Sequence, residues 1–247
     1  AFFLGYVIKK ALPLLGLRND QERIKHWSTA FVHMEKLINE VAWDGEWYKR
    51  AFFDDGTPLG SAQSLECKID SLPQSWSVLS AMSEGERGSL ALAAVENNLE
   101  EEQKKFIRLF KPSFDKMTPN PGYIKGYIAG VRENGGQYTH ATLWYLMALA
   151  KVGKVDRSFE LFSCVNPLAH TQNEADVKLY GAEPYVVVAD IYSNSSHFGR
   201  GGWSWYTGSA SWAYRYIYET LFGVQLLGGL KLQVKSNLPA ALLPCSL

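Results

Sequence analysis

The sequence predicts a mainly α-helical protein, built from successive helical hairpins whose connecting loops collect on one side. Three observations favour this class. Apolar residues recur with the spacing of amphipathic helices in several segments. The long segments between them (43–61, 111–140 and 194–208) concentrate aromatic and polar residues instead. A chain of 247 residues can also bury a sizeable core, at the upper edge for one domain.

The net charge indicates which partners to expect, and the cysteine content indicates the compartment. The formal net charge is zero, so no overall field attracts nucleic acid or anionic lipid, and we expect no nucleic-acid partner. The cysteines Cys67, Cys164 and Cys245 are odd in number, far apart and without metal-ligand spacing. This pattern argues against a disulfide framework and for a reducing compartment, so we expect a cytoplasmic location.

The first segment is apolar, but its residue pattern is not that of a secretory signal or of a membrane-spanning helix. Lys9 and Lys10 follow the apolar residues, whereas a secretory signal carries its positive charges first. The run is also too short and interrupted to cross a bilayer, so we expect no membrane segment here. We interpret Phe2 to Leu15 as a core helix of a larger protein.

The next elements follow from start signals and periodicity. Asn19-Asp20 is a helix start, and Gln21 to Val41 is expected to be an amphipathic helix. Its inward residues would be Ile24, Trp27, Phe31, Met34 and Ile38. An extended segment at Trp47–Phe52 should lead into a turn at Asp54–Pro58.

Two further helices precede a long loop. One should begin near Ser71, because Pro73 suits an early helical position. The second is expected from Glu86 to Lys105, with its Glu- and Lys-rich end solvated and paired along the helix. The segment 111–136, rich in proline, glycine and aromatic residues, is expected to be an irregular functional loop.

The second half of the chain repeats this alternation. A helix should begin near His140, and another should span Val155 to Cys164. The run Glu183 to Tyr192 could be a strand, because it contains β-branched Val186–Val188, but its helical neighbours favour a helix. A helix should follow Gly208, and the segment 224–234 should form a β-hairpin.

The segment Gly130 to Trp144 is the strongest candidate for a site. Arg132 and Glu133 precede an Asn-Gly-Gly turn, and His140 then falls in the first turn of a helix. A helix start offers unpaired N–H groups and a positive dipole end to an anion. The simpler alternative is an ordinary Arg132–Glu133 salt bridge with His140 as a core residue.

The aromatic loops suggest what else could bind. A sugar stacks its C–H face on an aromatic ring while its hydroxyl groups need paired donors and acceptors. One loop tryptophan more often caps a core than binds a ligand. Three loops that combine aromatic side chains with carboxylates and amides make a carbohydrate site the better interpretation.

Four segments resemble a known family. They are WDGEWYKRAFFDDGTPLGS, ECKIDSLPQSW, GYIKGYIAGVRENGGQYTHATLW, and EPYVVVADIY followed by GRGGWSWYTGSASWAYR. Together they resemble glycoside hydrolase family 94, inverting phosphorylases of disaccharides and oligosaccharides, and most of all the phosphorylase-like part of cyclic β-1,2-glucan synthases. The resemblance implies the second half of an (α/α)6 barrel over 1–223, a partial toroid. The start of a β-rich C-terminal region would follow over 224–247.

The resemblance also implies an activity and its residues. Inorganic phosphate would be the co-substrate, with no cofactor and no metal. A β-glucan oligosaccharide, by this resemblance β-1,2-linked, would be cleaved to α-glucose 1-phosphate with inversion. His140, Thr207 and Gly208 would bind phosphate. The residues implied near the sugar are Arg132, Glu133, Tyr127, Lys125, Gln74 and Trp76.

Two features depart from the family pattern. Ile128-Ala129 stands where the glucan-synthase branch of the family usually has a pair of prolines. The general acid of the family, an aspartate in a Trp-Asn-Asp segment, has no counterpart in this sequence. We therefore expect the acid upstream of Ala1, in a missing N-terminal half of the catalytic module, and this chain alone to be inactive.

Two other functions remain open from the sequence. One is a carbohydrate-binding or structural toroid without turnover. The other is an inverting hydrolase of a different (α/α)6 family that uses a local carboxylate pair such as Asp44 and Asp55.

Overall fold

The chain forms a mainly helical structure, described here from a computed structural model that covers residues 1–101, 105–205, 207–239 and 242. Its α-helices are α1 (Phe2–Leu17), α2 (Gln21–Leu37), α3 (Ser71–Leu79), α4 (Arg87–Leu99), α5 (Thr139–Lys151), α6 (Val155–Phe162), α7 (Glu174–Tyr180) and α8 (Thr207–Arg215). Wider turns extend two of them, η1 (Ile38–Ala42) after α2 and η5 (Tyr216–Leu221) after α8. Short 3-10 segments are η3 (Tyr123–Gly126) and η4 (Pro167–His170).

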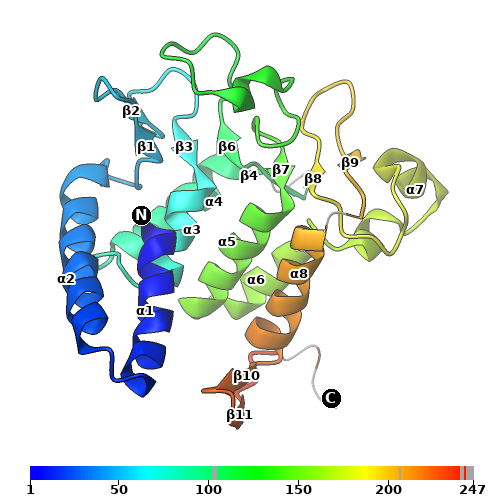
Figure 1. Ribbon diagram of the computed structural model, residues 1–247. Coiled ribbons are helices and arrows are strands. Elements are labelled where there is room, and N and C mark those ends of the chain that lie inside the picture. Colours follow the sequence, from blue (N-terminus) through cyan, green and yellow to red (C-terminus); the bar gives the residue numbers. More distant parts are fainter. Residues whose placement is uncertain (102–104, 206, 240–241, 243–247) are drawn as a thin grey trace.

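The helices form two layers of a partial (α/α) toroid. Helices α1, α3, α5 and α8 contact one another in that order and make the inner layer. Helices α2, α4 and α6 each pack outside the inner helix that neighbours them in the chain. Figure 1 shows the long loops between successive helical hairpins gathered at one end of this layer and the C-terminal hairpin at the other. The mainly α fold class is therefore confirmed.

An aromatic cluster joins the inner helices. The rings of Trp76 (α3) and Trp144 (α5) lie 5.3 Å apart, and those of Trp144 and Trp212 (α8) lie 5.4 Å apart, both edge to face. Phe3 of α1 packs edge to face on Trp76 at 4.8 Å. Such pairs contribute about 0.5–1.5 kcal/mol each beyond the area they bury. The cluster therefore ties all four inner helices to one another.

Short antiparallel strands tie the loops together at the same end. The strands are β1 (Ala51–Phe52), β2 (Pro58–Leu59), β3 (Ile69–Asp70), β4 (Glu100–Glu101), β5 (Phe106–Ile107), β6 (Phe110–Lys111), β7 (Gln137–Tyr138), β8 (Asp190–Ile191), β9 (Gly201–Gly202), β10 (Val224–Leu227) and β11 (Lys231–Val234). They pair as β1–β2, β3–β6, β4–β5, β7–β8–β9 and β10–β11. Only the last pair lies away from the loop end.

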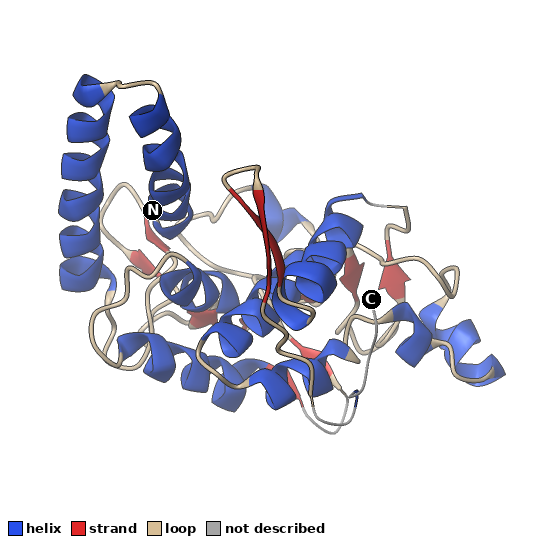
Figure 2. Cartoon of the chain, turned by 90° about the horizontal axis from the view of Figure 1, so that it is seen from below, coloured by secondary structure: helices blue, strands red, loops and turns tan. Residues whose placement is uncertain are grey.

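The first two helices form a hairpin that projects from the body of the molecule (Figure 2). Asp20 caps α2, since its side chain accepts the N–H of Arg23. Of the five residues expected to face inward, Ile38 is buried and the others are partly buried. Helix α1 exposes the apolar residues Phe3, Leu4, Val7, Leu14 and Leu17. Phe2, Gly5 and Ile8 of the same helix are buried, so the predicted core helix is only partly covered by the described residues.

The helix predicted from Glu86 to Lys105 is wrong in its last third. Helix α4 ends at Leu99, and Glu100 and Glu101 form strand β4, paired with β5. Glu100 is held by Arg157 and by the hydroxyl of Tyr145, while Glu101 pairs with Arg108. These tertiary ion pairs replace the local pairs along a helix. The remainder of that acidic run lies outside the described residues.

The preferred helix over Glu183–Tyr192 is also wrong. This segment is irregular until β8, the central strand of β7–β8–β9. The backbone groups of Asp190 and Ile191 pair with Tyr138 and Gln137 on one side and with the glycines of β9 on the other. The β-branched composition, not the helical neighbours, was the better guide. Helix α7, which caps on Asn173, was not predicted.

The strand pair β10–β11 confirms the β-hairpin predicted over 224–234. Within the described part of the chain, no helix has the length and apolar character needed to cross a membrane. The same residues contain no group of His, Cys, Asp and Glu arranged to hold a metal ion.

Candidate functional site

His140 lies at the loop end of the inner layer, in the first turn of α5. Strand β7 leads directly into this helix, and Thr139 fixes the junction by donating its hydroxyl to the carbonyl of Val188 at 2.7 Å. The ring of His140 stacks on Tyr138 at 5.1 Å and tilts against Trp144 at 6.0 Å. Partial burial lowers the pKa of His140, and the nearby Glu133 carboxylate opposes this shift. A lowered pKa favours the neutral imidazole, which can both donate and accept.

Helix α8 brings its first turn against this ring. A Cβ placed on Gly208 would lie 2.6 Å from Nε2 of His140, closer than real Cβ contacts allow. The structure thus brings together two residues that are far apart in the sequence. Thr207 is the first residue of α8, so its backbone adjoins the same place, but its side chain lies outside the described ones.

Arg132 is the best-enclosed cation near this place. Its side chain is buried, and the guanidinium carbon lies 4.0 Å from the Trp203 ring centroid and 5.5 Å from that of Tyr127. Its Nε lies 3.4 Å from the Glu133 carboxylate, so the simple salt bridge is present, although long. Its Nη1 is buried without a hydrogen-bond partner among the described residues. An arginine N–H without an acceptor is costly in the free protein and suits a ligand oxygen.

Asp190, which sequence reasoning missed, holds the backbone of Arg132. Its Oδ2 accepts the N–H of Arg132 at 2.8 Å, where Arg132 has a left-handed φ of 50°. Burial raises the pKa of the Asp190 carboxyl to about 6, although the Arg132 N–H and charge oppose the shift. One signal could have found it, because a single carboxylate inside the apolar run VVVADIY needs a buried partner.

Trp203 is a second residue that sequence reasoning did not single out. It follows β9, and a Cβ on Gly202 would lie 2.5 Å from Oδ1 of Asp190. Only glycine therefore lets β9 approach β8 this closely, and this approach sets Trp203 against Arg132. The signal was the Gly-Gly-Trp sequence, since glycine in a strand often marks a close backbone approach.

A cavity of about 200 Å³ lies next to the rings that pack on His140. Those two rings, Tyr138 and Trp144, form part of its wall together with Glu133. Arg50 and Asp70 add an ion pair at 3.6 Å to the same wall. The Nε1 group of Trp144 is buried without a partner among the described residues. The cavity wall thus combines aromatic rings with carboxylates, which suits a sugar ring.

The other residues implied near the sugar fall into two groups. Tyr127 lies against Arg132, while Lys125 donates to the carbonyl of Met117 at 3.0 Å. Gln74 is fully buried, and its amide serves the backbone of Tyr48 and Asp70. Trp76 belongs to the buried aromatic cluster. Gln74 and Trp76 therefore contribute to the framework between the helices, and neither lines the cavity.

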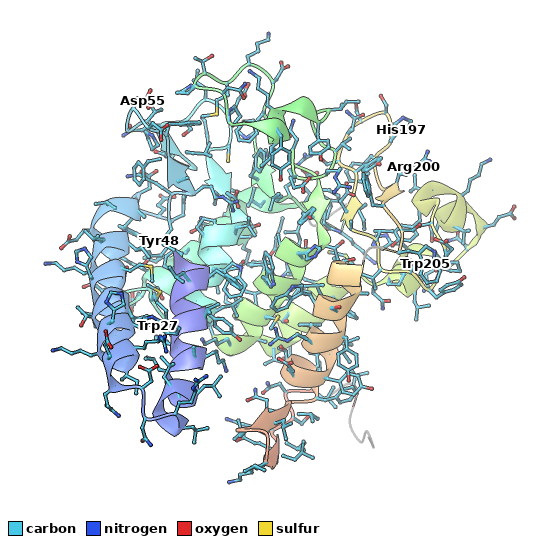
Figure 3. All side chains as sticks on the ribbon, in the orientation of Figure 1. Trp27, Tyr48, Asp55, His197, Arg200 and Trp205 are labelled. Carbon is cyan, nitrogen blue, oxygen red and sulfur yellow. The ribbon has the colours of Figure 1, made fainter. Side chains whose placement is uncertain are left out.

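Asp44 and Asp55, the carboxylate pair of the hydrolase alternative, each hydrogen-bond to the backbone of a loop or turn. Asp44 accepts the N–H of Ala62 and pairs with Lys49. Asp55 accepts the N–H of Thr57 at the exposed tip of the β1–β2 hairpin, where Figure 3 shows it far from Trp205 on the opposite side. Neither residue lines the cavity.

Comparison with known proteins adds an independent finding. Residues 1–223 match the profile described as "Glycosyl hydrolase 94 superfamily, catalytic domain". The chain is 42% identical over 239 residues to cyclic beta-(1,2)-glucan synthase NdvB of Rhizobium meliloti, covering 97% of this chain and 8% of that protein. It is 32% identical over 228 residues to N,N'-diacetylchitobiose phosphorylase of Vibrio proteolyticus, covering 91% of this chain and 28% of that protein.

A further relative is 3-O-beta-D-glucopyranosyl-beta-D-glucuronide phosphorylase of Paenibacillus borealis, 29% identical over 233 residues, with 93% of this chain and 29% of the relative covered. The chain therefore spans less than a third of the length of each of these relatives.

Proposed function

The chain belongs to the glycosyl hydrolase 94 family, and we propose that it is part of a phosphorylase that cleaves β-glucosidic bonds with inorganic phosphate. The substrate would be a β-1,2-glucan, and the product α-glucose 1-phosphate, formed with inversion. We also propose that residues 1–223 are the second half of the catalytic barrel and that a β-rich region begins at 224.

The chemistry follows from that of an inverting glycosidase. Such an enzyme uses one carboxylic acid to protonate the leaving oxygen and one carboxylate to activate water. Phosphate is already an anionic nucleophile, so a phosphorylase needs a phosphate cradle in place of the base. The cradle must hold phosphate on the face of the sugar opposite the leaving group.

The contact between His140 and Gly208 is the observation that carries this proposal. An imidazole and the first turn of a helix together offer N–H donors and a positive dipole end to a tetrahedral anion. Thr207, at the start of the same helix, would add its hydroxyl. A Cβ at position 208 would lie 2.6 Å from Nε2 of His140, so any residue other than glycine would displace this ring.

The sugar would lie in the neighbouring cavity. Tyr138 and Trp144 offer aromatic faces, and Glu133 offers a carboxylate. Arg132 would donate a hydrogen bond from Nη1 to an oxygen of the substrate. This bond would remove the energetic cost of burying a donor without an acceptor. Tyr127, and Lys125 beyond it, would line the acceptor side.

The general acid would come from a Trp-Asn-Asp segment of a longer protein. General acid catalysis is typically worth about 10²–10⁴-fold in rate. The partner that completes the site would therefore be the remaining part of the catalytic domain, and the chain alone would bind phosphate or glucan without turnover.

Phosphate binding by the chain tests this proposal without requiring turnover. The measurement is the broadening of the phosphorus NMR signal of inorganic phosphate as protein is added. We expect specific broadening by the wild-type chain and its loss in His140→Ala. Equal broadening by both proteins would contradict the assignment of the cradle.

A further inference from the structure

We propose that Trp203 is a stacking platform for an additional glucose unit of a longer glucan, outside the cavity that holds the sugar at the cleavage site. This inference rests on the proposed function, since it assumes a glucan ligand. It adds a residue and a chain-length preference that the family match does not contain.

The indole is presented to solvent on a rigid support. Trp203 is 58% exposed, so a ligand can reach part of its indole ring. One side of its ring is covered by the Arg132 guanidinium at 4.0 Å, and Tyr127 lies 5.5 Å from the same guanidinium. The three side chains form a ladder, Tyr127–Arg132–Trp203, that ends in the exposed indole.

Buried contacts hold each step of this ladder in place. The Asp190 carboxylate fixes the backbone of Arg132, and the close approach of β9 to β8 at Gly202 fixes the start of Trp203. Trp203 itself adopts a left-handed φ of 55°. A bulky residue in this region is strained by about 1–3 kcal/mol, and such strain concentrates at ligand sites.

The strand register places Trp203 next to the cavity but outside its wall. Register across β7–β8–β9 aligns Tyr138 with Asp190 and Asp190 with Gly202. Trp203 is therefore one residue beyond the strand position that aligns with Tyr138, the ring that stacks on His140. Trp203 does not line the cavity beside Tyr138. A glucan held in the cavity would need further units to reach the indole, so short sugars would not use it.

The chemistry of the indole suits a glucose ring. A pyranose presents an apolar C–H face that packs on an aromatic surface. The π-face of the indole is also polarised by the cation beneath it. Because the platform is held in place before binding, little side-chain entropy is lost when a sugar stacks on it.

The test compares sugars of different length on the chain as it exists. Binding of the β-1,2-linked glucose disaccharide and of longer β-1,2-gluco-oligosaccharides is measured by calorimetry for wild type, Trp203→Ala and Trp203→Phe. We expect Trp203→Ala to weaken the longer sugars roughly tenfold and to leave the disaccharide unchanged, with Trp203→Phe close to wild type. Tyr214→Ala, an aromatic residue of similar exposure (61%) on α8, serves as the matched control.

The outcomes separate the two proposals. If Trp203→Ala bound longer sugars as tightly as wild type, or weakened the disaccharide equally, the platform would be refuted while a glucan ligand remained. If the wild-type chain bound none of these sugars, the glucan assignment would fail and the platform with it. Circular dichroism of each variant shows whether the fold is retained. If the Ala variant unfolds, Trp203→Gln, which keeps a long side chain but no aromatic face, should show the same loss for the longer sugars, and wild-type affinity in that variant would refute the platform.

Discussion

Gly208 and His140 touch across two inner helices, so closely that a methyl group on the glycine would lie 2.6 Å from Nε2 of the imidazole. The contact sets the first turn of α8 against the first turn of α5 at the loop end of the toroid. A ring nitrogen and helix N–H groups thus meet where a cavity opens beside Tyr138 and Trp144.

Replacing Gly208 with alanine should damage the cradle directly. The added methyl group would push the His140 ring away from the start of α8, so phosphate affinity should fall by about tenfold or more, the equivalent of one lost charge-assisted hydrogen bond. Phosphate titration of the variant measures the effect. Gly16→Ala in α1, where a Cβ would meet nothing within 4 Å, should bind phosphate like wild type. Equal binding by both variants would contradict the contact.

Two substitutions of His140 should separate hydrogen bonding from charge. Burial lowers the pKa of His140, so the neutral imidazole should predominate near pH 7 and act as an N–H donor. His140→Gln keeps a neutral N–H donor and should retain much of the phosphate affinity that His140→Ala loses. The dissociation constant for phosphate is measured for both. A Gln variant as weak as the Ala variant would mean that binding needs the imidazolium.

Asp190 should make stability depend on pH. Its pKa in the folded protein is raised to about 6 from 3.8, so the folded state binds the proton more tightly than the unfolded state. The stability contributed by the protonated carboxyl is complete below pH 3.8 and is lost as pH rises through 6. The loss should amount to at most about 3 kcal/mol.

Asp190→Asn isolates this effect, because the amide cannot ionise and the other groups are shared. The free energy of unfolding is measured by denaturant titration between acidic and neutral pH for both proteins. Wild type should lose more stability than the variant as pH rises. A constant difference between the two across this range would refute the raised pKa.

The ion pair between Glu100 and Arg157 should matter for stability. Their side chains meet at 2.5 Å, and the Glu100 side chain is only 4% exposed. Glu100→Ala would leave the Arg157 charge and the Tyr145 hydroxyl without this partner, at a cost of about 3 kcal/mol. Glu160→Ala removes another partner of Arg157 and should cost less than about 1 kcal/mol, because the Glu160 side chain is 65% exposed. Thermal unfolding compares them, and similar losses would argue against a buried pair.

Local sequence patterns predicted the long helices well. Apolar spacing predicted helices α2 and α5. Asp20 marked the start of α2, and the Asn-Gly-Gly turn marked the segment that leads into α5. Short elements failed where tertiary contacts decide. Glu100 leaves the helix because Arg157 and Tyr145 hold it, and β8 is a strand because two other strands flank it. Neither set of partners is near in the sequence.

The candidate site was predictable to a similar limit. His140 and Arg132 stand out because a turn and a helix start surround them. The link from His140 to Gly208 came from family resemblance, since no local pattern joins the two positions. Asp190 and Trp203 were missed because their roles come from a backbone hydrogen bond and a ring contact across strands. Gln74 looked available in the sequence, but its amide serves buried backbone groups.

The most direct test is release of glucose 1-phosphate from β-1,2-oligoglucan and inorganic phosphate. The assay compares this chain, a longer protein that includes the upstream Trp-Asn-Asp segment, and the same longer protein with His140→Ala. We predict release by the longer protein, none by the chain alone, and a His140→Ala variant that needs far more phosphate. Robust release by the chain alone would show that the acid lies within these residues. Release of free glucose independent of phosphate, or an unaffected His140→Ala variant, would contradict the phosphorylase account.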